Sequence, residues 1–377
     1  YTDLEKAFDK VPHKRLISKL HSYGINSDVI HWIEAFLANR KQRVKINNSA
    51  SDWASVISGI PQGSILGPLL FIIYINDLIE SCNNGSELYL YADDAKLFKH
   101  ILNDYDKSIL QNDLDNLSHW TEQWLLKLNV NKCKHMSFQR ANELSLYQYN
   151  IRGTNLEHVG AIKDLGVTFD GKLKFANHIC EKVNKAYSIL GIIKRNFQYL
   201  SDECFVTLYK SVVRPHLEYA QGVWSPHLIG QIKNIEKVQM RATKMVSRLK
   251  ALPYNERLRE LNLPTLRYRR LRGDMIELYK MIMGIYNKEI SLEIQYNTSN
   301  LRGNRYKLFQ HQLHYDLRKF SFSNRIVNVW NSLPDAVVAV NNLNSFKTAL
   351  DRYWTHQDIK YNWKSELSGL GSRTVKD

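Results

Sequence analysis

The sequence has little cysteine, and its four cysteines are scattered over 377 residues. None belongs to a Cys-x-x-Cys pair of the kind found in zinc and redox sites; they stand at Cys82, Cys133, Cys180 and Cys204. This spacing predicts reduced thiols packed inside an intracellular protein rather than a disulfide framework.

Long hydrophobic runs are also absent. The longest, Leu69 to Ile75, is followed by Asn76 and Asp77 and is far shorter than the roughly 20 apolar residues that span a bilayer. There is no initiator methionine and no signal peptide, and Tyr1 to Asp3 reads as the middle of a strand. We therefore expect a fragment of a larger protein that has no membrane contact.

Acidic residues are in deficit. The chain carries 52 Lys and Arg against 37 Asp and Glu, a formal net charge of +15. Such an excess favours a polyanionic partner, and nucleic acid fits better than a membrane because no lipid-binding motif accompanies the charge. The 44% hydrophobic content is that of a globular protein with room for two or three domains.

Two runs of alternating apolar and polar residues, 87–90 and 95–98, flank the four residues Tyr91-Ala92-Asp93-Asp94. This pattern predicts a β-hairpin with Asp93 and Asp94 near its tip. Two adjacent carboxylates repel each other unless a cation lies between them. An ordinary hairpin with a polar turn is the alternative, because an isolated Asp-Asp pair does not by itself indicate a metal site.

Other segments are predicted from their periodicity and turn residues. Helices are expected over 16–23, 27–37, 66–78 and 110–128, paired strands over 43–46 and 53–57, a strand over 131–138, and a second hairpin over 165–173. The loop 58–64 contains two glycines, which would allow a ligand to approach the backbone closely.

A longer helix is predicted over 232–249, with apolar residues on one face. Five cations fall within roughly 80° of each other on the opposite face, and they are Lys233, Lys237, Arg241, Lys244 and Arg248. A solvated cationic face is the alternative, but the absence of any acid among them favours contact with phosphates. More arginine follows at Arg267, Arg269, Arg270 and Arg272.

Three motifs occur in order: Asp-x-x-x-x-Phe at 3–8, Ser-Gly-Ile-Pro-Gln-Gly-Ser at 58–64 and Tyr-Ala-Asp-Asp at 91–94. Together they resemble motifs A, B and C of reverse transcriptases. The wider wording is similar to non-LTR (LINE-type) retrotransposon enzymes of the jockey and chicken-repeat kind. Runs that carry this likeness lie at 6–13, 66–71, 214–220, 235–239, 263–266 and 329–334, so the resemblance covers nearly the whole chain.

The resemblance implies a two-metal nucleotidyl-transfer site. Asp3, Asp93 and Asp94 would be the catalytic metal ligands, with the Leu4 carbonyl as a further oxygen. Two Mg²⁺ ions are expected, with Mn²⁺ as the alternative, because hard cations prefer oxygen ligands. Asp9 is the rival acid in the first motif; Asp3 is preferred because the aromatic residue of the family's sugar gate then falls at Phe8.

The resemblance also implies contacts to substrate. Phe8 would exclude a ribose 2′-hydroxyl, although core packing is its alternative. Gln62 and Gly63 would lie along the nucleotide and template, and Lys132 would neutralise the leaving pyrophosphate unless it is a plain surface lysine. Leu165, Gly166 and Val167 would grip the primer, and the basic face would contact the RNA–DNA hybrid.

The implied fold is α+β: a right-hand polymerase palm over 1–174, a basic helical thumb over 175–290, and a small C-terminal region of unknown role over 291–377. The fingers would precede motif A, so this fragment is expected to be weakly active or inactive alone. The implied function is RNA-directed DNA synthesis from dNTPs on a primer and an RNA template, in the nucleus or cytoplasm.

Two alternatives to this function remain. A non-catalytic nucleic-acid-binding remnant of a mobile element would keep the fold and its charge without turnover. A group II intron maturase or a telomerase-type enzyme would share the palm, but the wording of the C-terminal part argues against it.

Overall fold

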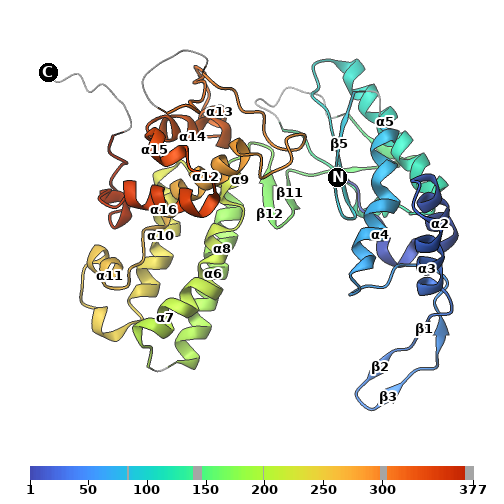
Figure 1. Cartoon of the computed structure of the whole chain (residues 1–377), viewed down its shortest axis with the longest axis horizontal. Helices are drawn as coiled ribbons and strands as arrows, with labels where there is room; N and C mark the ends of the chain where they lie inside the picture. The colour runs from blue at the N-terminus through green and yellow to red at the C-terminus, as the bar shows by residue number, and fades with distance from the viewer. Residues whose placement is uncertain (83–84, 139–146, 198, 298–303, 370–377) are drawn as a thin grey trace. The chain divides into compact units, whose positions relative to one another are not determined.

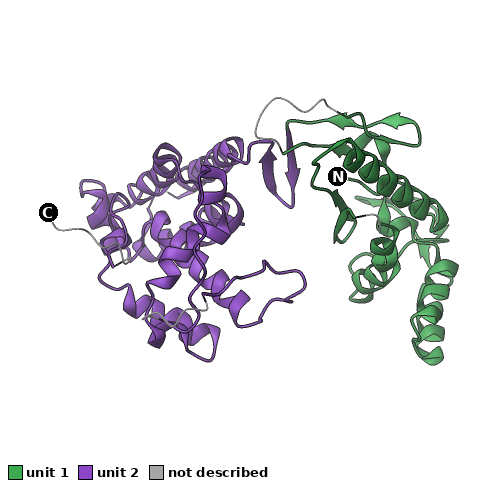
Figure 2. Ribbon diagram, turned by 90° about the horizontal axis from the view of Figure 1, so that it is seen from above, with its two compact units in different colours: residues 1–160 green, residues 161–377 purple. Residues whose placement is uncertain are grey.

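The computed structural model describes residues 1–82, 85–138, 147–197, 199–297 and 304–369 (Figure 1). The chain forms two compact units, residues 1–160 (unit 1) and residues 161–377 (unit 2), coloured green and purple in Figure 2. Both helices and short sheets occur, in an α+β arrangement. Within the described ranges, none of the helices has the length and apolar character needed to cross a membrane.

The helices of unit 1 follow the predicted segments but differ at their ends. They are α1 (Ala7–Lys10), α2 (His13–Ser22), α3 (Ser27–Leu37), α4 (Leu66–Ile75), the 3₁₀ turn η1 (Asn76–Ser81) and α5 (Asp104–Gln123). The cap of α3 is Asn26, whose side chain accepts the Asp28 amide and which lies just before the predicted start at residue 27. The α5 helix stops before Leu125, which has a left-handed backbone (φ 57°), so the predicted extension to residue 128 was wrong.

The predicted Asp-Asp hairpin is confirmed as β5 (Glu87–Tyr91) paired antiparallel with β6 (Asp94–Phe98). Leu88, Leu90, Ala95 and Leu97 alternate along the two strands and join the core of unit 1. The N-terminal segment runs beside β6 through a bridge between Thr2 and Ala95, and its other side bridges Leu4 to Leu128. The first residues therefore lie between two chain segments that are far away in sequence.

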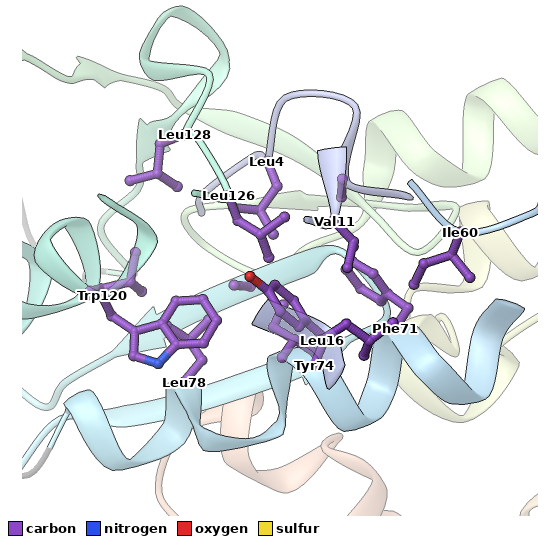
Figure 3. Packing of buried hydrophobic residues seen from close by; sticks show 14 of the residues in the cluster. Leu4, Val11, Leu16, Ile60, Phe71, Tyr74, Leu78, Trp120, Leu126 and Leu128 are labelled. Atoms are coloured by element: carbon purple, nitrogen blue, oxygen red, sulfur yellow. The ribbon is translucent and has the colours of Figure 1, made fainter. Parts of the chain in front are cut away.

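Helix α4 packs along one side of the unit 1 core. Figure 3 shows its Tyr74 pointing toward Leu4 and Leu126, and its Phe71 lying near Val11. Burial accounts for only part of the apolar run 69–75, because Leu69 and Ile72 are about half exposed while the buried residues of α4 join the core.

One cation lies inside this core. Lys19 is 2% exposed and donates to the Tyr74 carbonyl at 2.5 Å. Its Nζ lies 3.8 Å from the ring centroid of Trp124 and 4.6 Å from that of Trp120, and it pairs with Asp77. Burial lowers the pKa of the Lys19 ammonium. The sequence had placed Lys19 only inside an amphipathic helix.

A hairpin follows α3, longer than predicted. Strand β1 (Lys41–Gln42) pairs with β4 (Ala54–Ser55), and β2 (Lys45–Ile46) pairs with β3 (Ser49–Ala50). The turn is formed by Asn47 and Asn48, with Asn47 at φ 52°. The prediction had assigned residues 49 and 50 to the turn, whereas they extend the second strand.

The end of unit 1 has only short strands. They are β7 (Lys134–His135), parallel to β10 (Glu157–His158), and β8 (Asn150–Ile151), antiparallel to β9 (Thr154–Asn155). The predicted strand over 131–138 is reduced to β7, because the 3₁₀ turn η2 (Val130–Lys132) occupies its beginning. Part of that stretch therefore lies in a turn.

Unit 2 is mainly helical. Its strands are β11 (Ala161–Asp164) and β12 (Val167–Asp170), and its first helices are α6 (Ala176–Asn196), α7 (Asp202–Leu208), the π-helical turn η3 (Tyr209–Val213), α8 (Pro215–Glu218), α9 (Gln221–Trp224) and α10 (Ile229–Thr243). The rest are η4 (Ser247–Leu249), α11 (Tyr254–Glu260), α12 (Leu266–Ile282), α13 (Asp316–Lys319), α14 (Phe322–Asn331), α15 (Asp335–Val338), α16 (Leu343–Tyr353) and η5 (Asp358–Lys360).

Two hydrophobic clusters fill unit 2, and α12 belongs to both. Leu266 ends the cluster that begins at Val167, whereas Tyr268, Met275 and Tyr279 pack with residues up to Leu367. The predicted divisions at 174/175 and 290/291 are divisions by function, and they stay predictions. By packing, the hairpin β11–β12 belongs with the helices that follow it.

Candidate active site

Backbone hydrogen bonds set the position of Asp3. The Thr2 amide donates to the Ala95 carbonyl at 2.9 Å, and the Asn129 amide donates to the Asp3 carbonyl at 2.8 Å. In an antiparallel register centred on Thr2 and Ala95, the next residue pair is Asp3 and Asp94. The structure therefore brings the first acid beside the Tyr-Ala-Asp-Asp hairpin, across 90 residues of sequence.

The hairpin turn consists of Ala92 and Asp93, and it is closed by the pair Tyr91 and Asp94. Ala92, the first residue of the turn, has a left-handed backbone at φ 51°, and two-residue hairpin turns commonly have a positive φ at this position. Asp93 is half-buried and Asp94 is exposed. Among the described residues, no three His, Cys, Asp or Glu side chains are gathered closely enough to hold a metal ion. The backbone thus aligns the acids, while their side chains remain apart.

Asp3 has a distinctive polar environment. Its Oδ2 is buried without a hydrogen-bond partner, and the Lys132 ammonium lies 3.4 Å from it. The Asp3 amide donates to the Sγ of Cys133 at 3.4 Å, and burial raises the pKa of that thiol. The predicted Lys132 therefore stands next to a predicted metal ligand, although its side chain is 67% exposed. The sequence predicted only that Cys133 is a packed thiol.

The glycine loop is joined to the motif A segment. A Cβ on Gly59 would lie 2.6 Å from the Asp9 carbonyl oxygen, the Gly59 amide donates to the Val11 carbonyl at 2.8 Å, and His13 Nε2 lies 2.8 Å from the Gly59 carbonyl. The expectation that both glycines admit a ligand was therefore wrong for Gly59, which admits a neighbouring chain segment. A glycine beside Ile60-Pro61 could have indicated a tight turn, but the sequence could not show that the segment at Asp9 packs against it.

The second glycine differs from the first. Gly63 has φ +84° and open space around its Cβ position. Gln62 is exposed and donates to Asp9 Oδ1 at 3.1 Å. Asp9, the rival acid, is thus hydrogen-bonded to the loop. The predicted ligand contacts of Gln62 and Gly63 stay predictions.

Phe8 is half-buried, and its ring stacks on Phe71 of α4 with centroids 4.4 Å apart and an interplanar angle of 22°. This contact favours the packing interpretation for one face of the ring. A role as a sugar gate stays a prediction.

The hairpin β11–β12 has Leu165 and Gly166 at its turn, both at positive φ (42° and 80°). Tyr219 Oη donates to the Leu165 carbonyl at 2.9 Å, and its ring limits the space at Gly166. Leu165 is 41% exposed, whereas Val167 is 3% exposed and belongs to the core. Of the predicted primer-grip residues, Val167 therefore has no side-chain surface to offer. Tyr219 was missed because it is 54 residues away in sequence.

The basic helix is shorter than predicted. Helix α10 ends at Thr243 with Lys244 as its C-cap, and Val246 has an extended backbone. Lys233, Lys237, Arg241 and Lys244 are exposed. Arg248 lies beyond the helix and pairs with Asp202 and with Glu260 at 3.0 Å. The expectation of five aligned cations was therefore wrong at its end, because the apolar spacing continues past the point where the helix stops.

The arginines of α12 are held inside unit 2. Arg267 donates to the Trp363 and Ser365 carbonyls at 3.0 and 3.1 Å, and Arg272 pairs with Asp351. Arg269 pairs with Glu218, and Arg270 is 4% exposed. These contacts join the region after residue 291 to the helices before it.

Comparisons with known proteins agree with these motifs. A family model described as reverse transcriptase (RNA-dependent DNA polymerase) matches residues 1–200, more than half of the chain. The chain is 29% identical over 275 residues to the RNA-directed DNA polymerase from mobile element jockey of Drosophila melanogaster. That match covers 69% of this chain and 29% of the relative.

Two further relatives come from other elements. The probable RNA-directed DNA polymerase from transposon X-element of Drosophila melanogaster is 27% identical, over 70% of this chain and 30% of its own length. The retrovirus-related Pol polyprotein from type-1 retrotransposable element R2 of Popillia japonica is 24% identical, over 44% of this chain and 30% of its own length. The chain thus spans less than a third of these relatives. It belongs to the reverse transcriptase (RNA-dependent DNA polymerase) family.

Proposed function

We propose that this chain is the polymerase part of an RNA-directed DNA polymerase of a non-LTR retrotransposon. It adds deoxynucleotides from dNTPs to a primer 3′-hydroxyl on an RNA template. The observation that carries the proposal is the bridge between Thr2 and Ala95, which joins the residue before Asp3 to the residue after Asp94. Residues 1–174 are the palm and residues 175–290 the thumb of this proposed enzyme.

The residues suit a divalent metal. Asp3, Asp93 and Asp94 offer hard oxygen ligands, and Asp3 Oδ2 is a buried oxygen with no hydrogen-bond partner in the described chain. These three carboxylates, with the Leu4 carbonyl, would hold Mg²⁺ or Mn²⁺ once their side chains converge. Bound there, two such ions would supply activation of the primer hydroxyl and neutralisation of the departing pyrophosphate.

The chain's own residues prepare this site. Lys132 offsets the charge of Asp3 at 3.4 Å and would protonate or neutralise the leaving pyrophosphate. Gln62 and Gly63 lie on an exposed loop whose base is fixed to α1 through Gly59. Phe8, whose peptide carbonyl accepts the Ile60 amide at 2.8 Å, belongs to the same junction and would select deoxyribose.

Outside unit 1, the proposal assigns the nucleic acid to two further surfaces. The turn Leu165–Gly166 of the β11–β12 hairpin would contact the primer. The exposed cations Lys233, Lys237, Arg241 and Lys244 would contact phosphates of the RNA–DNA hybrid, in a salt-dependent manner.

A second candidate function is nucleic-acid binding without catalysis. The separation of the three carboxylates in the described chain favours it. The two functions differ in one respect that can be measured: only the polymerase incorporates nucleotides when Mg²⁺ or Mn²⁺ is added.

Primer extension on an RNA template with dNTPs tests the proposal. Because the chain alone is expected to be weakly active, we expect a low level of metal-dependent incorporation. It should fall more than about 100-fold in Asp93→Asn and in Asp3→Asn, because loss of a direct ligand exceeds the 10–100-fold typical of residues behind it. Asp9→Asn is the matched control and should retain incorporation. RNA binding without incorporation by the parent chain would support the second candidate, and loss in Asp9→Asn with retention in Asp3→Asn would reverse the choice of ligand.

A further inference from the structure

The hairpin that follows α3, residues 40–57 and here called the arm, lies outside the proposed active site. Its base is closed by the Val56 amide, which donates to the Arg40 carbonyl at 2.9 Å. Further out, the Ser51 amide donates to the Val44 carbonyl at 2.9 Å. Every residue of its four strands is exposed. A two-stranded ribbon without a packed face is marginally stable in water, so a surface of this kind favours an occupant.

The charge of the arm is strongly one-sided. Its cations are Arg40, Lys41, Arg43 and Lys45, and its only acid is Asp52. All four cations are exposed, and within the described part of the chain none of them pairs with a carboxylate. This differs from the α12 arginines, whose charges are largely met by neighbouring acids and carbonyls. The arm's charges are therefore available to an anionic ligand.

Aromatic rings accompany these charges. The Arg43 guanidinium lies 4.6 Å from the ring centroid of Trp53, which is 60% exposed. At the base of the arm, Arg40 lies 5.5 Å from the ring centroid of Phe36, which in turn stacks against Trp32 at 6.0 Å. Open aromatic rings next to cations are the combination on which unpaired bases stack while their phosphates are neutralised.

The strand pattern places these groups on one side. Successive residues of an extended strand point to opposite faces, so Lys41 and Arg43 share a face. The β2–β3 pairs are offset by one residue from the β1–β4 pairs, so alternation does not carry this face on to Lys45, which is an exposed cation further out on the arm. The pairing of Lys41 with Ser55 continues in register to Arg43 opposite Trp53, which agrees with their ring contact. The opposite face carries the exposed apolar residue Val44, and Ile46 is also exposed. The arm thus has one cationic and aromatic face.

We propose that this face of the arm, together with Lys45, binds single-stranded RNA, with a base stacked on Trp53 and phosphates on Lys41, Arg43 and Lys45. The inference rests on the proposed function, for which it names a template site outside the palm. The arm leads through Ile57 directly into the loop 58–64, so RNA bound along it would continue toward Gln62. Duplex nucleic acid keeps its bases stacked inside the helix, and it would leave the Trp53 ring unused.

Binding of a fluorescent oligouridine in EDTA, followed by anisotropy at several salt concentrations, tests the inference. The double variant Arg43→Ala/Lys45→Ala should bind at least about 10-fold more weakly and reduce the salt slope by about 1.4, which corresponds to two lost phosphate contacts on a single strand. Trp53→Ala should also lose about 10-fold, and Trp53→Phe should restore most of it because it keeps a stacking ring.

The matched control is Lys14→Ala/Arg15→Ala, which removes the same charge from α2 of the same unit. It should bind like the parent. Equal losses in the control and in the arm variant would reduce the effect to net charge and overturn the inference, as would unchanged binding by Trp53→Ala. A second copy of this chain is the rival occupant: a dimer that Ile46→Asn dissociates, and whose formation oligouridine does not oppose, would also overturn it.

The metal-free assay separates the two proposals. Asp93→Asn should bind oligouridine like the parent even though it cannot extend a primer. Arm-dependent binding without incorporation by the parent would leave the inference standing and remove the polymerase. Incorporation by the parent, together with parent-like oligouridine binding by every arm variant, would leave the polymerase standing and overturn the inference.

Discussion

Two basic stretches, the α12 arginines of unit 2 and the arm of unit 1, place their cations differently. Arg267 and Arg272 of α12, with the neighbouring Arg325, meet carboxylates and carbonyls inside unit 2. The cations of the arm face solvent, where Arg40 and Arg43 lie against aromatic rings. The sequence shows both as basic stretches. A run of cations in the sequence therefore indicates a nucleic-acid surface only where the folded chain places no carboxylates next to those cations.

In unit 2, removing one partner of a buried ion pair should strongly lower the free energy of unfolding. Arg325 donates to Asp274 at 2.8 and 2.9 Å, and to the Gly222 carbonyl at 2.9 Å. Asp274 is 3% exposed. Arg325→Ala would leave that carboxylate buried and unpaired, and should lower the free energy of unfolding by about 4 kcal/mol. Urea denaturation measures this. A loss below about 1 kcal/mol would mean that the pair is not truly internal.

Lys19 is a buried cation of unit 1, and its removal offers a second test of the same contrast. Lys19→Met would remove its contact with the Trp124 ring and leave the Tyr74 carbonyl and Asp77 without their donor. We expect a loss of about 2 kcal/mol, less than for Arg325 because the Asp77 side chain is 25% exposed and can be hydrated. Thermal unfolding of the two variants side by side gives the order. Lys14→Met, on the exposed side of the same helix, is the control.

A buried base adds a pH dependence to unit 2. His178 Nδ1 accepts the Thr168 amide at 3.1 Å, and burial lowers the pKa of His178 from 6.5 to about 4. The unfolded chain therefore takes up a proton between these values that the folded chain does not. Stability contributed by His178 is complete above pH 6.5 and is lost as the pH falls toward 4.

The expected loss from His178 between about pH 7 and about pH 5 is about 2 kcal/mol. Denaturation at both pH values, compared with His178→Gln, isolates this share from that of the carboxylates. The variant should show a shallower pH dependence. Parallel curves for the two proteins would contradict the neutral, buried histidine.

The smallest expected change in stability belongs to the arm. Arg43→Ala should alter the free energy of unfolding by less than about 0.5 kcal/mol, because its guanidinium is exposed and pairs with no described carboxylate. The same variant should weaken RNA binding. A loss of stability as large as that of Arg325→Ala would erase the distinction between the two sets of cations.

Local features of the fold were largely predictable from the sequence. Alternation predicted the hairpin β5–β6, and apolar periodicity predicted α2 to α5 and α10. Helix ends were not, since the apolar spacing continues past Thr243 and past Gln123 although the backbone turns away at Lys244 and Leu125. Apolar periodicity depends on which residues are buried. It does not change where the backbone leaves the helical conformation, so it does not locate the helix end.

The candidate site shows a similar division. The motif resemblance pointed to Asp3, Asp93 and Asp94, and the strand register places Asp3 beside Asp94. The contacts of Gly59 with Asp9, of Lys132 with Asp3 and of Tyr219 with Leu165 were beyond the sequence. Each depends on how distant segments pack, and no pattern within one segment carries that information.

The central claim is that Asp3 and the Asp93–Asp94 turn share a metal. Iron(II) can replace Mg²⁺ at oxygen ligands and, with ascorbate and peroxide, cleaves the backbone close to the bound ion. If these acids share a metal, the parent chain should be cleaved within both residues 1–5 and residues 91–95. Cleavage should be lost at both places in Asp93→Asn and retained in Asp9→Asn. Cleavage near the hairpin alone, with the N-terminal segment intact, would contradict it.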